Sequence, residues 1–207
     1  MATVVGFVSQ KGGVGKSTLS RALAREAVNS GLAVKVADLD PQQGTSVNWG
    51  RRRQVAGIEP IVPVESFGKA AQALAIADQY DLLVIDGPAK ASEQTLLIAK
   101  GADLVIQPSG TGLDDLEPGV ILFNDLIKAG IPRAKLAFAL NRAGTEAEEA
   151  QARDYIGQAG YDVLPGCLFE RPAYRQAQND GYAVTETRYA KLSQRADQLL
   201  QGIVDRL

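Results

Sequence analysis

Histidine is absent from this 207-residue sequence, and cysteine, methionine and tryptophan each occur once. Without histidine, the chain has no imidazole that could serve as a general base or a metal ligand. The single cysteine, Cys167, excludes an internal disulfide and any zinc site built mainly of cysteines. No apolar run approaches transmembrane length, and no basic-then-apolar signal peptide opens the sequence. We therefore expect a soluble, cytoplasmic protein.

An excess of either charge is also lacking. Lys and Arg total 22 against 24 Asp and Glu, a net charge of -2, so any affinity for nucleic acid requires a local basic patch. Hydrophobic residues make up 45% of the chain, which is enough to fill one sizeable core. No repeat, low-complexity segment or long linker divides the sequence. A single domain over residues 1–207 is therefore expected.

The most informative stretch is QKGGVGKST, residues 10–18. It follows an apolar run over residues 4–8 that predicts a buried strand, and a helical pattern begins near Ser17. A glycine-rich turn between a strand and a helix directs backbone N–H groups toward a phosphate, and the start of the helix favours negative charge. Lys16 adds a positive charge, and the Ser17 hydroxyl is placed to bind Mg²⁺. The expected nucleotide-binding residues here are Gly12, Gly13, Val14, Gly15, Lys16, Ser17 and Thr18.

Short apolar runs alternate with helical periodicity along the rest of the chain. Strands are predicted over residues 33–37, 61–64, 82–85, 104–107, 136–140 and 162–164, and helices near residues 17–30, 68–77, 93–100, 116–128 and 147–158. Nearly all-apolar strands separated by helices form parallel sheets that are buried on both faces. We therefore expect an α/β fold, a doubly wound and mostly parallel sheet flanked by helices on both faces. In such sheets, ligands bind at the carboxyl ends of the strands.

Acidic residues follow two of these predicted strands. Asp86 comes directly after residues 82–85, and Asp38 and Asp40 follow residues 33–37. A nucleotide with bound Mg²⁺ needs a carboxylate near the metal, and hydrolysis needs a group that orients the attacking water. Asp86 is the expected carboxylate near the Mg²⁺ ion, and the Ser17 hydroxyl is the second expected protein group at the metal.

The glycine loop departs from the usual G-x-x-x-x-G-K-[ST] pattern, because Gln10 stands at the first glycine position. Its K-G-G-x-G-K-[ST] form, with a second lysine at Lys11, resembles the deviant Walker A motif of the ParA/MinD family of ATPases. The resemblance extends from Val4 to about Val184. It implies a P-loop fold, ATP and Mg²⁺ as ligands, and a homodimer that closes on ATP and reopens after slow hydrolysis. It also implies that Lys11 reaches the nucleotide of the partner subunit.

The same resemblance assigns the residues that follow the strands. Asp38 and Asp40 match the D-x-D-P-Q segment called switch I, in which the second aspartate positions the water and the first lies near the metal. Lys11, Lys16 and Asp40 are therefore the expected catalytic residues. Residues 87–89 match switch II, with Gly87 where relatives more often carry threonine. Asn141 matches a residue that reads the adenine edge. Residues 168–172 resemble a late loop that lines the base, with Arg171 expected at the rim of the base pocket.

Residues 42–49, which end in Trp49, look like the single-domain members of the family, and no helix-turn-helix precedes the first strand. Those members bind nucleoid DNA without sequence preference, and a ParB-like or adaptor protein stimulates their hydrolysis. They position a plasmid, a chromosome or a protein assembly. The candidate DNA contacts are Arg188, Lys191 and Arg195, expected on one face of the last helix, and the run Arg51, Arg52 and Arg53. A solvated charged surface would give the same pattern.

Other functions of this fold class are also open. A MinD-like ATPase that binds membranes needs a basic amphipathic helix at its end, but Asp197 and Asp205 interrupt the basic face here, so no membrane binding is expected. A biosynthetic enzyme would need a second substrate pocket, to which nothing in the sequence points. An iron protein of the nitrogenase kind needs a second cysteine. A module that does not hydrolyse ATP would not need both Asp40 and Asp86.

Overall fold

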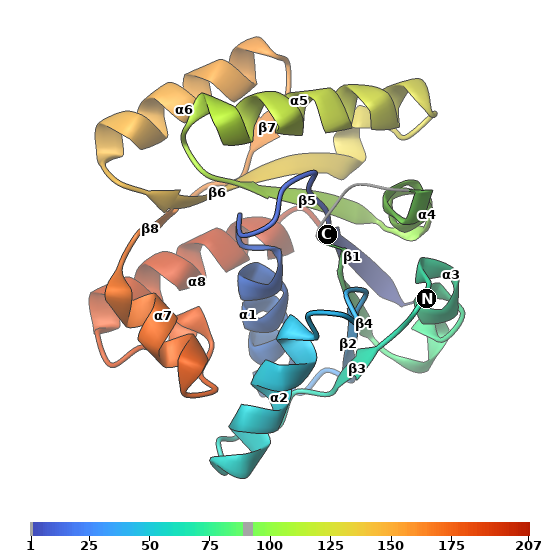
Figure 1. Cartoon of the computed structure of the whole chain (residues 1–207), viewed down its shortest axis with the longest axis vertical. Coiled ribbons are helices and arrows are strands. Elements are labelled where there is room, and N and C mark those ends of the chain that lie inside the picture. The colour runs from blue at the N-terminus through green and yellow to red at the C-terminus, as the bar shows by residue number, and fades with distance from the viewer. Residues whose placement is uncertain (1, 89–92) are drawn as a thin grey trace.

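The computed structural model describes residues 2–88 and 93–207, and it shows a central sheet with helices on both sides (Figure 1). The strands are β1 (Thr3–Phe7), β2 (Val34–Asp38), β3 (Val64–Ser66), β4 (Leu82–Asp86), β5 (Leu104–Ser109), β6 (Leu136–Ala143), β7 (Asp162–Val163) and β8 (Leu168–Phe169). The helices are α1 (Lys16–Asn29), α2 (Thr45–Val55), α3 (Ala70–Leu74), α4 (Glu93–Gly101), α5 (Leu113–Lys128), α6 (Glu146–Gln158), α7 (Pro172–Asn179) and α8 (Ala190–Val204).

The strand order places the glycine-rich loop at the centre of the sheet edge. The described strands run β3-β2-β4-β1-β5-β6-β7, and β8 pairs with β6. Each of these pairings is parallel. β1 lies between β4 and β5, so the direction of chain progression reverses at β1. Crevices at such a switch point are where doubly wound sheets bind their ligands. The expected fold class is confirmed.

A separate hydrophobic core covers each face of the sheet. One core joins the strands to α3, α4, α5 and α6 and contains the edge-packed rings of Phe123, Phe138 and Tyr161. The other joins them to α1, α2, α7 and α8 and contains Trp49. Strands buried on both sides need apolar residues at almost every position, which explains why these strands are continuous apolar runs in the sequence.

Several boundaries differ from those predicted. The strand expected over residues 61–64 is β3, which begins only at Val64, because Pro60 and Pro63 have no N–H to donate to a ladder. The helix expected over residues 68–77 ends at Leu74. β6 continues to Ala143, so Asn141 lies inside a strand.

The late part of the chain contains more regular structure than the sequence indicated. Residues 168–172, expected as a loop, contain β8 and the first residue of α7, with Pro172 at the first helical position. The last helix, α8, begins at Ala190, so Arg188 precedes it. In the described parts of the chain, no helix has the length and apolar character needed to cross a bilayer.

Candidate nucleotide-binding site

Two glycines give the loop between β1 and α1 its shape. Gly13 and Gly15 have φ of 79° and 109°, a left-handed region that other residues adopt at a cost. Gly15 immediately precedes α1 and packs against the side chain of Asn141, since a Cβ at Gly15 would lie 1.8 Å from the amide nitrogen. Asn141 Nδ2 in turn donates to the carbonyl of Val14 at 3.0 Å. The loop is therefore held from the β6 side.

Lys16 opens α1 and is only 7% exposed. Its Nζ donates to the carbonyl of Lys11 at 3.1 Å, so the side chain folds back along the loop. Burial lowers the pKa of Lys16, against the opposing effect of Asp86 and Asp40. The first-turn N–H groups of a helix have no intrahelical acceptor and carry its positive dipole end. Together with Lys16 they make this end of α1 favourable for an anion.

The acidic strand ends meet beside this loop. Asp38 and Asp86 are direct neighbours in the register of β2 and β4. Asp38 Oδ1 accepts from the Asp40 N–H at 3.0 Å, and Oδ2 accepts from the N–H groups of Ser46 at 2.9 Å and Val47 at 3.1 Å. Asp38 therefore caps α2 and holds the segment carrying Asp40. Both carboxylate oxygens of Asp38 therefore accept hydrogen bonds from backbone N–H groups, although the residue lies near the expected metal position.

Asp86 keeps one oxygen free. Its Oδ2 accepts from the Ser46 hydroxyl at 2.7 Å, whereas its buried Oδ1 has no hydrogen-bond partner among the described residues. Burial raises the pKa of Asp86, and the hydrogen bond from Ser46 and the nearby Ser17 hydroxyl oppose that effect. An unpaired buried carboxylate oxygen beside a serine hydroxyl fits a divalent cation. Mg²⁺ commonly uses one or two carboxylates and takes its other ligands from phosphates and water.

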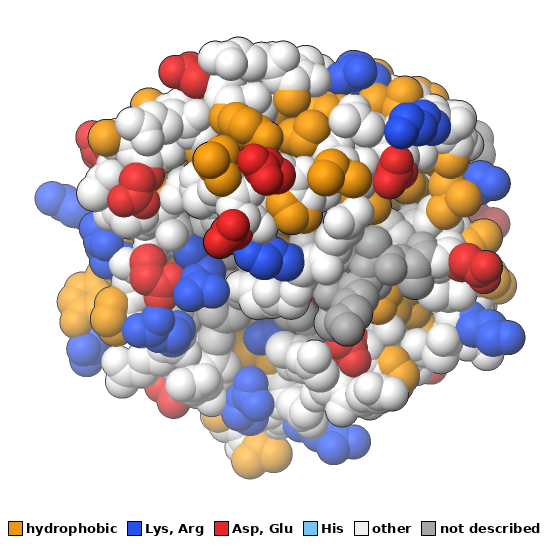
Figure 2. Space-filling model, turned by 45° about the horizontal axis from the view of Figure 1, so that its top comes forward, with side chains coloured by type: hydrophobic (Ala, Val, Ile, Leu, Met, Phe, Trp, Pro, Cys, Tyr) orange, Lys and Arg blue, Asp and Glu red, His pale blue; other side chains and the backbone are white. Residues whose placement is uncertain are grey.

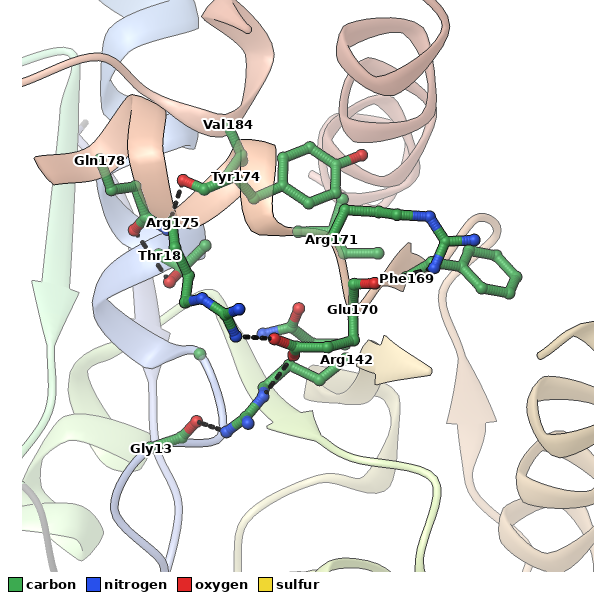
Figure 3. A pocket seen from close by; sticks show the side chains of 13 residues that line it. Gly13, Thr18, Arg142, Phe169, Glu170, Arg171, Tyr174, Arg175, Gln178 and Val184 are labelled. Atoms are coloured by element: carbon green, nitrogen blue, oxygen red, sulfur yellow. Dashed lines mark hydrogen bonds and ion pairs between the residues drawn. The ribbon is translucent and has the colours of Figure 1, made fainter. Parts of the chain in front are cut away.

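Two adjoining cavities surround the loop. The first, of about 230 Å³, is lined by the loop glycines, Lys16, Ser17, Thr18, Arg21, Asp40, Asp86 and Gln178. The second, of about 260 Å³, is lined by Asn141, Phe169, Arg171 and Tyr174 among others (Figure 3). Gly13, Gly15, Thr18 and Gln178 line both. The first cavity holds the phosphate-loop and acidic residues, whereas the second combines the aromatic rings of Phe169 and Tyr174 with Asn141 and several charged side chains. This division fits the two ends of a nucleotide.

A network of ion pairs lines the second cavity. Figure 3 shows Glu170 between Arg142 and Arg175, and both arginines bond its carboxylate. Arg142, which has a positive φ of 59°, also donates to the carbonyl of Gly13 at 3.2 Å. The sequence prediction included neither arginine. A basic residue directly after Asn141 is the one signal that could have drawn attention to this corner.

Arg171 is among the residues that line this cavity. It precedes α7, and its Nη1 donates to the carbonyl of Glu170 at 2.8 Å. Its guanidinium lies 5.8 Å from the centre of the Phe169 ring, and in Figure 3 it points away from Gly13 and Thr18.

Lys11 is engaged within its own chain. Its Nζ lies 2.6 Å from Asp115 Oδ1, at the start of α5, and this hydrogen bond raises the pKa of Lys11. The lysine is on the surface, with 46% of its side chain exposed. A contact with a partner subunit would require Lys11 to leave Asp115.

Gly87 has a steric reason to replace threonine. A Cβ at this position would lie 2.4 Å from the carbonyl oxygen of Phe7, closer than any carbon can sit without backbone movement. A threonine hydroxyl therefore cannot be presented from this backbone position. Ala89, the last residue of the expected switch II segment, lies outside the described residues.

The candidate DNA contacts differ in burial: Arg53 is buried and the other five are exposed. Arg53 is 1% exposed and its guanidinium bonds the Glu186 carboxylate at 2.6 Å, so the prediction of Arg53 as a DNA contact is wrong. Arg51 and Arg52 are exposed. The prediction that Arg188 lies on the last helix is also wrong.

Lys191 and Arg195 lie on α8 and are exposed. Arg195 lies 4.5 Å from the centre of the Phe169 ring and 3.5 Å from Glu146. On the face displayed in Figure 2, Lys and Arg side chains are interspersed with Asp and Glu. That face has no extended basic field.

The structure also adds residues that the sequence did not single out. Arg21 on α1, Ser46 on α2 and Gln178 on α7 line or support the first cavity. They come from distant parts of the chain, and no local pattern joins them.

The fold and this loop define a P-loop nucleotide-binding domain of the kind with a second lysine at the head of the loop. Residues 5–184 match the family described as CobQ/CobB/MinD/ParA nucleotide binding domain. The chain belongs to this family, and the resemblance noted in the sequence is confirmed.

Individual relatives agree with that assignment. The chromosome-partitioning ATPase Soj of Thermus thermophilus is 29% identical over 199 residues, covering 78% of this chain and 80% of Soj. The cell division ATPase MinD of Pyrococcus furiosus superposes with a TM-score of 0.79 at 18% identity over 100% of both chains. MinD of Pyrococcus horikoshii, complexed with Mg-ADP, gives 0.75 at 20% identity over 98% and 96% of the two chains. At these identities, the two MinD structures show a shared fold.

Proposed function

We propose that this protein is an ATPase that dimerises on ATP, binds nucleoid DNA without sequence preference and positions a cargo, with slow hydrolysis resetting the dimer. The observation that carries the proposal is the free Oδ1 of Asp86, buried beside Ser17 in the cavity that Lys16 and Asp40 also line. A phosphate group and a divalent cation together satisfy both the positive loop and this oxygen. Similarity to Soj supports the partitioning role.

Each residue has a distinct part in the proposed reaction. Lys16 and the first-turn N–H groups bind the phosphates, and Asp86 with Ser17 would hold Mg²⁺, which supplies charge neutralisation when bound. Asp40 orients the attacking water, because it lines the phosphate cavity and its segment is anchored by Asp38. Asn141 and Arg171 line the base half. Lys11 supplies positive charge across the dimer interface, in the manner of a trans-acting finger.

Membrane positioning is the less favoured alternative. The apolar stripe of α8 is buried against the sheet, with Leu199, Leu200 and Ile203 all in the core. These side chains are not available to enter a bilayer surface. A partner protein, ParB-like or an adaptor, is proposed as the stimulator of hydrolysis.

The experiment that tests the proposal measures molar mass by light scattering with and without Mg²⁺ and ATP. The wild-type chain should be a monomer without nucleotide and a dimer with ATP. Asp40→Ala should remain a dimer for longer, because the water is no longer oriented. Lys11→Ala should bind ATP and stay a monomer.

Lys128→Ala is the matched control, since Lys128 is exposed on α5 and pairs only with Asp125 at 3.4 Å among the described contacts. It should dimerise as the wild type does. A Lys11→Ala variant that dimerises on ATP, or an Asp40→Ala variant with rapid turnover, would contradict the assigned roles.

A further inference from the structure

Arg21 is a buried charge that the loop motif does not explain. It lies on α1, one helical turn after Ser17, and is 4% exposed. Burial lowers its pKa to about 10, against the opposing effect of Asp86. Its Nη2 is buried and has no hydrogen-bond partner among the described residues, and Arg21 lines the phosphate cavity. Buried donors without partners are rare and costly, so this position requires a reason.

On one side, the Arg21 guanidinium orients the Ser46 hydroxyl, which in turn bonds the carboxylate of Asp86. Arg21 Nε donates to the hydroxyl oxygen of Ser46 at 3.1 Å. The serine hydroxyl has a single proton, and it is given to Asp86 Oδ2 at 2.7 Å. Arg21 thereby fixes the direction of the Ser46 hydroxyl, and this leaves Oδ1 as the free oxygen of Asp86.

The other side of the guanidinium reaches the helix that borders the base pocket. Arg21 Nη1 lies 3.5 Å from Gln178 Oε1 on α7, and the same oxygen accepts from Thr18 Oγ1 at 3.0 Å. Gln178 lines both cavities. One planar guanidinium, with donors in a rigid fork, therefore contacts elements from both halves of the nucleotide site.

The guanidinium also lies beside the only tryptophan of the chain. Trp49 on α2 is fully buried, with the Arg21 guanidinium 5.7 Å and the Arg53 guanidinium 5.5 Å from its ring. Its Nε1 is fixed by a 3.0 Å hydrogen bond to the carbonyl of Tyr182. The indole ring is therefore fixed in position, and one of the two charges beside it, Arg21, also lines the phosphate cavity. A displacement of the Arg21 guanidinium should change the fluorescence emission of Trp49.

We propose that Arg21 is a positioning residue that couples the metal side of the nucleotide site, through Ser46 and Asp86, to the base side, through Gln178 on α7. The inference rests on the proposed function, because it assigns the two cavities to the two ends of ATP. The coupling depends on the fork of donors. A lysine at this position has the charge but cannot direct two hydrogen bonds in fixed geometry.

The test follows Trp49 emission and ATP turnover in the full chain. Adding Mg²⁺ to the ATP-bound wild type should change the emission. In Arg21→Met and in Arg21→Lys this Mg²⁺-dependent change should be lost, and turnover should fall by about tenfold or more, the usual effect of losing a charged hydrogen bond. Arg21→Met combined with Gln178→Leu should be no slower than Arg21→Met alone, because residues of one unit are not additive.

Arg25→Met is the matched control. Arg25 lies one turn further along α1 and pairs with Glu186 and Glu26, away from both cavities. It should keep the wild-type emission change and turnover. If Arg21→Met does not fold, Ser46→Ala and Gln178→Leu each remove one side of the connection while Arg21 stays. Each variant should lose the Mg²⁺-dependent emission change and turn over ATP more slowly, and the double variant should be no slower than the slower single variant.

Three results would overturn the inference. Arg21→Lys could restore both readouts, which would show that charge alone matters. Arg21→Met could lose thermal stability while keeping both readouts, which would show a structural role only. The effects of the Arg21 and Gln178 variants could multiply, which would show independent sites. A wild-type chain that binds no ATP would instead overturn the proposed function, and the inference with it.

Discussion

Single side chains decide whether the phosphate loop can form. At Gly15 two requirements coincide, a φ of 109° and a neighbouring amide that would lie 1.8 Å from any Cβ. Gly31 has a comparable φ of 86° but open space around it. Alanine substitutions at the two positions can therefore distinguish the cost of a strained backbone from the loss of the nucleotide site.

Gly15→Ala should abolish ATP binding, because the Cβ displaces Asn141 and reshapes the loop. Gly31→Ala should cost about 1–2 kcal/mol of stability from its left-handed backbone and leave ATP binding unchanged. Thermal unfolding and titration with a fluorescent ATP analogue measure the two effects. Equal ATP affinity in both variants would contradict the packing of Asn141 against the loop.

At the scale of elements, a buried ion pair fixes α2 against the chain between α7 and α8. Glu186 bonds Arg53 at 2.6 Å, Arg25 at 2.9 Å and the N–H of Ala183 at 2.7 Å. Burial works to raise the pKa of Glu186, but these partners outweigh it and hold the pKa below the usual 4.5. A carboxyl with a lowered pKa stabilises the fold above its unfolded pKa, and the contribution is lost as the pH falls through the folded value.

Glu186→Gln should lower the free energy of unfolding near neutral pH by about 3 kcal/mol, because it leaves Arg53 buried without its counter-charge. The difference from wild type should shrink as the pH drops below 4.5. Denaturant titrations across pH measure it. Glu65→Gln is the control, since Glu65 is 54% exposed in its pair with Lys35 and should cost less than about 1 kcal/mol. A pH-independent difference would argue against the ion pair.

Arg53 also shows where prediction from the sequence ends. Three consecutive arginines read as one basic run, but a helix turns about 100° per residue, so Arg53 faces the core while Arg51 and Arg52 face solvent. The loop, Asp40 and Asp86 could be predicted because each motif lies on one continuous segment. Arg21, Ser46 and Gln178 meet only through packing of α1, α2 and α7. The α7 sequence, PAYRQAQN, is short and largely polar, and only Tyr174 and Ala177 are buried, so its apolar face spans too few residues to stand out in the sequence.

At the scale of the whole molecule, the proposed DNA binding needs a local basic patch, because one subunit carries a net charge of -2 and bulk charge gives no attraction to phosphates. The proposed dimer would bring the patches of two subunits together. If each subunit makes about three phosphate contacts through Arg188, Lys191 and Arg195, log affinity should fall with log salt with a slope of about -5. Replacing all three with Glu should remove DNA retention and leave hydrolysis without DNA near normal. Filter binding across salt concentrations measures both predictions.

The comparable control replaces Arg51 and Arg52 with Glu on α2. Unchanged DNA retention in the first variant together with loss in the second would move the interface to α2. A salt-independent interaction would contradict phosphate contacts altogether.

The pair between Lys11 and Asp115 has a consequence for how the proposed dimer responds to its surroundings. Since Lys11 already has a counter-ion at 2.6 Å, moving to a phosphate of the other subunit exchanges one anion for another. The total number of ion pairs does not change, so this contact adds little salt dependence to assembly, unlike DNA binding. The exchange would leave the negative charge of Asp115 without its lysine partner. Asp115 lies next to Asp114 at the start of α5. Closure of the dimer would thus uncover an acidic site in each subunit that does not exist in the monomer.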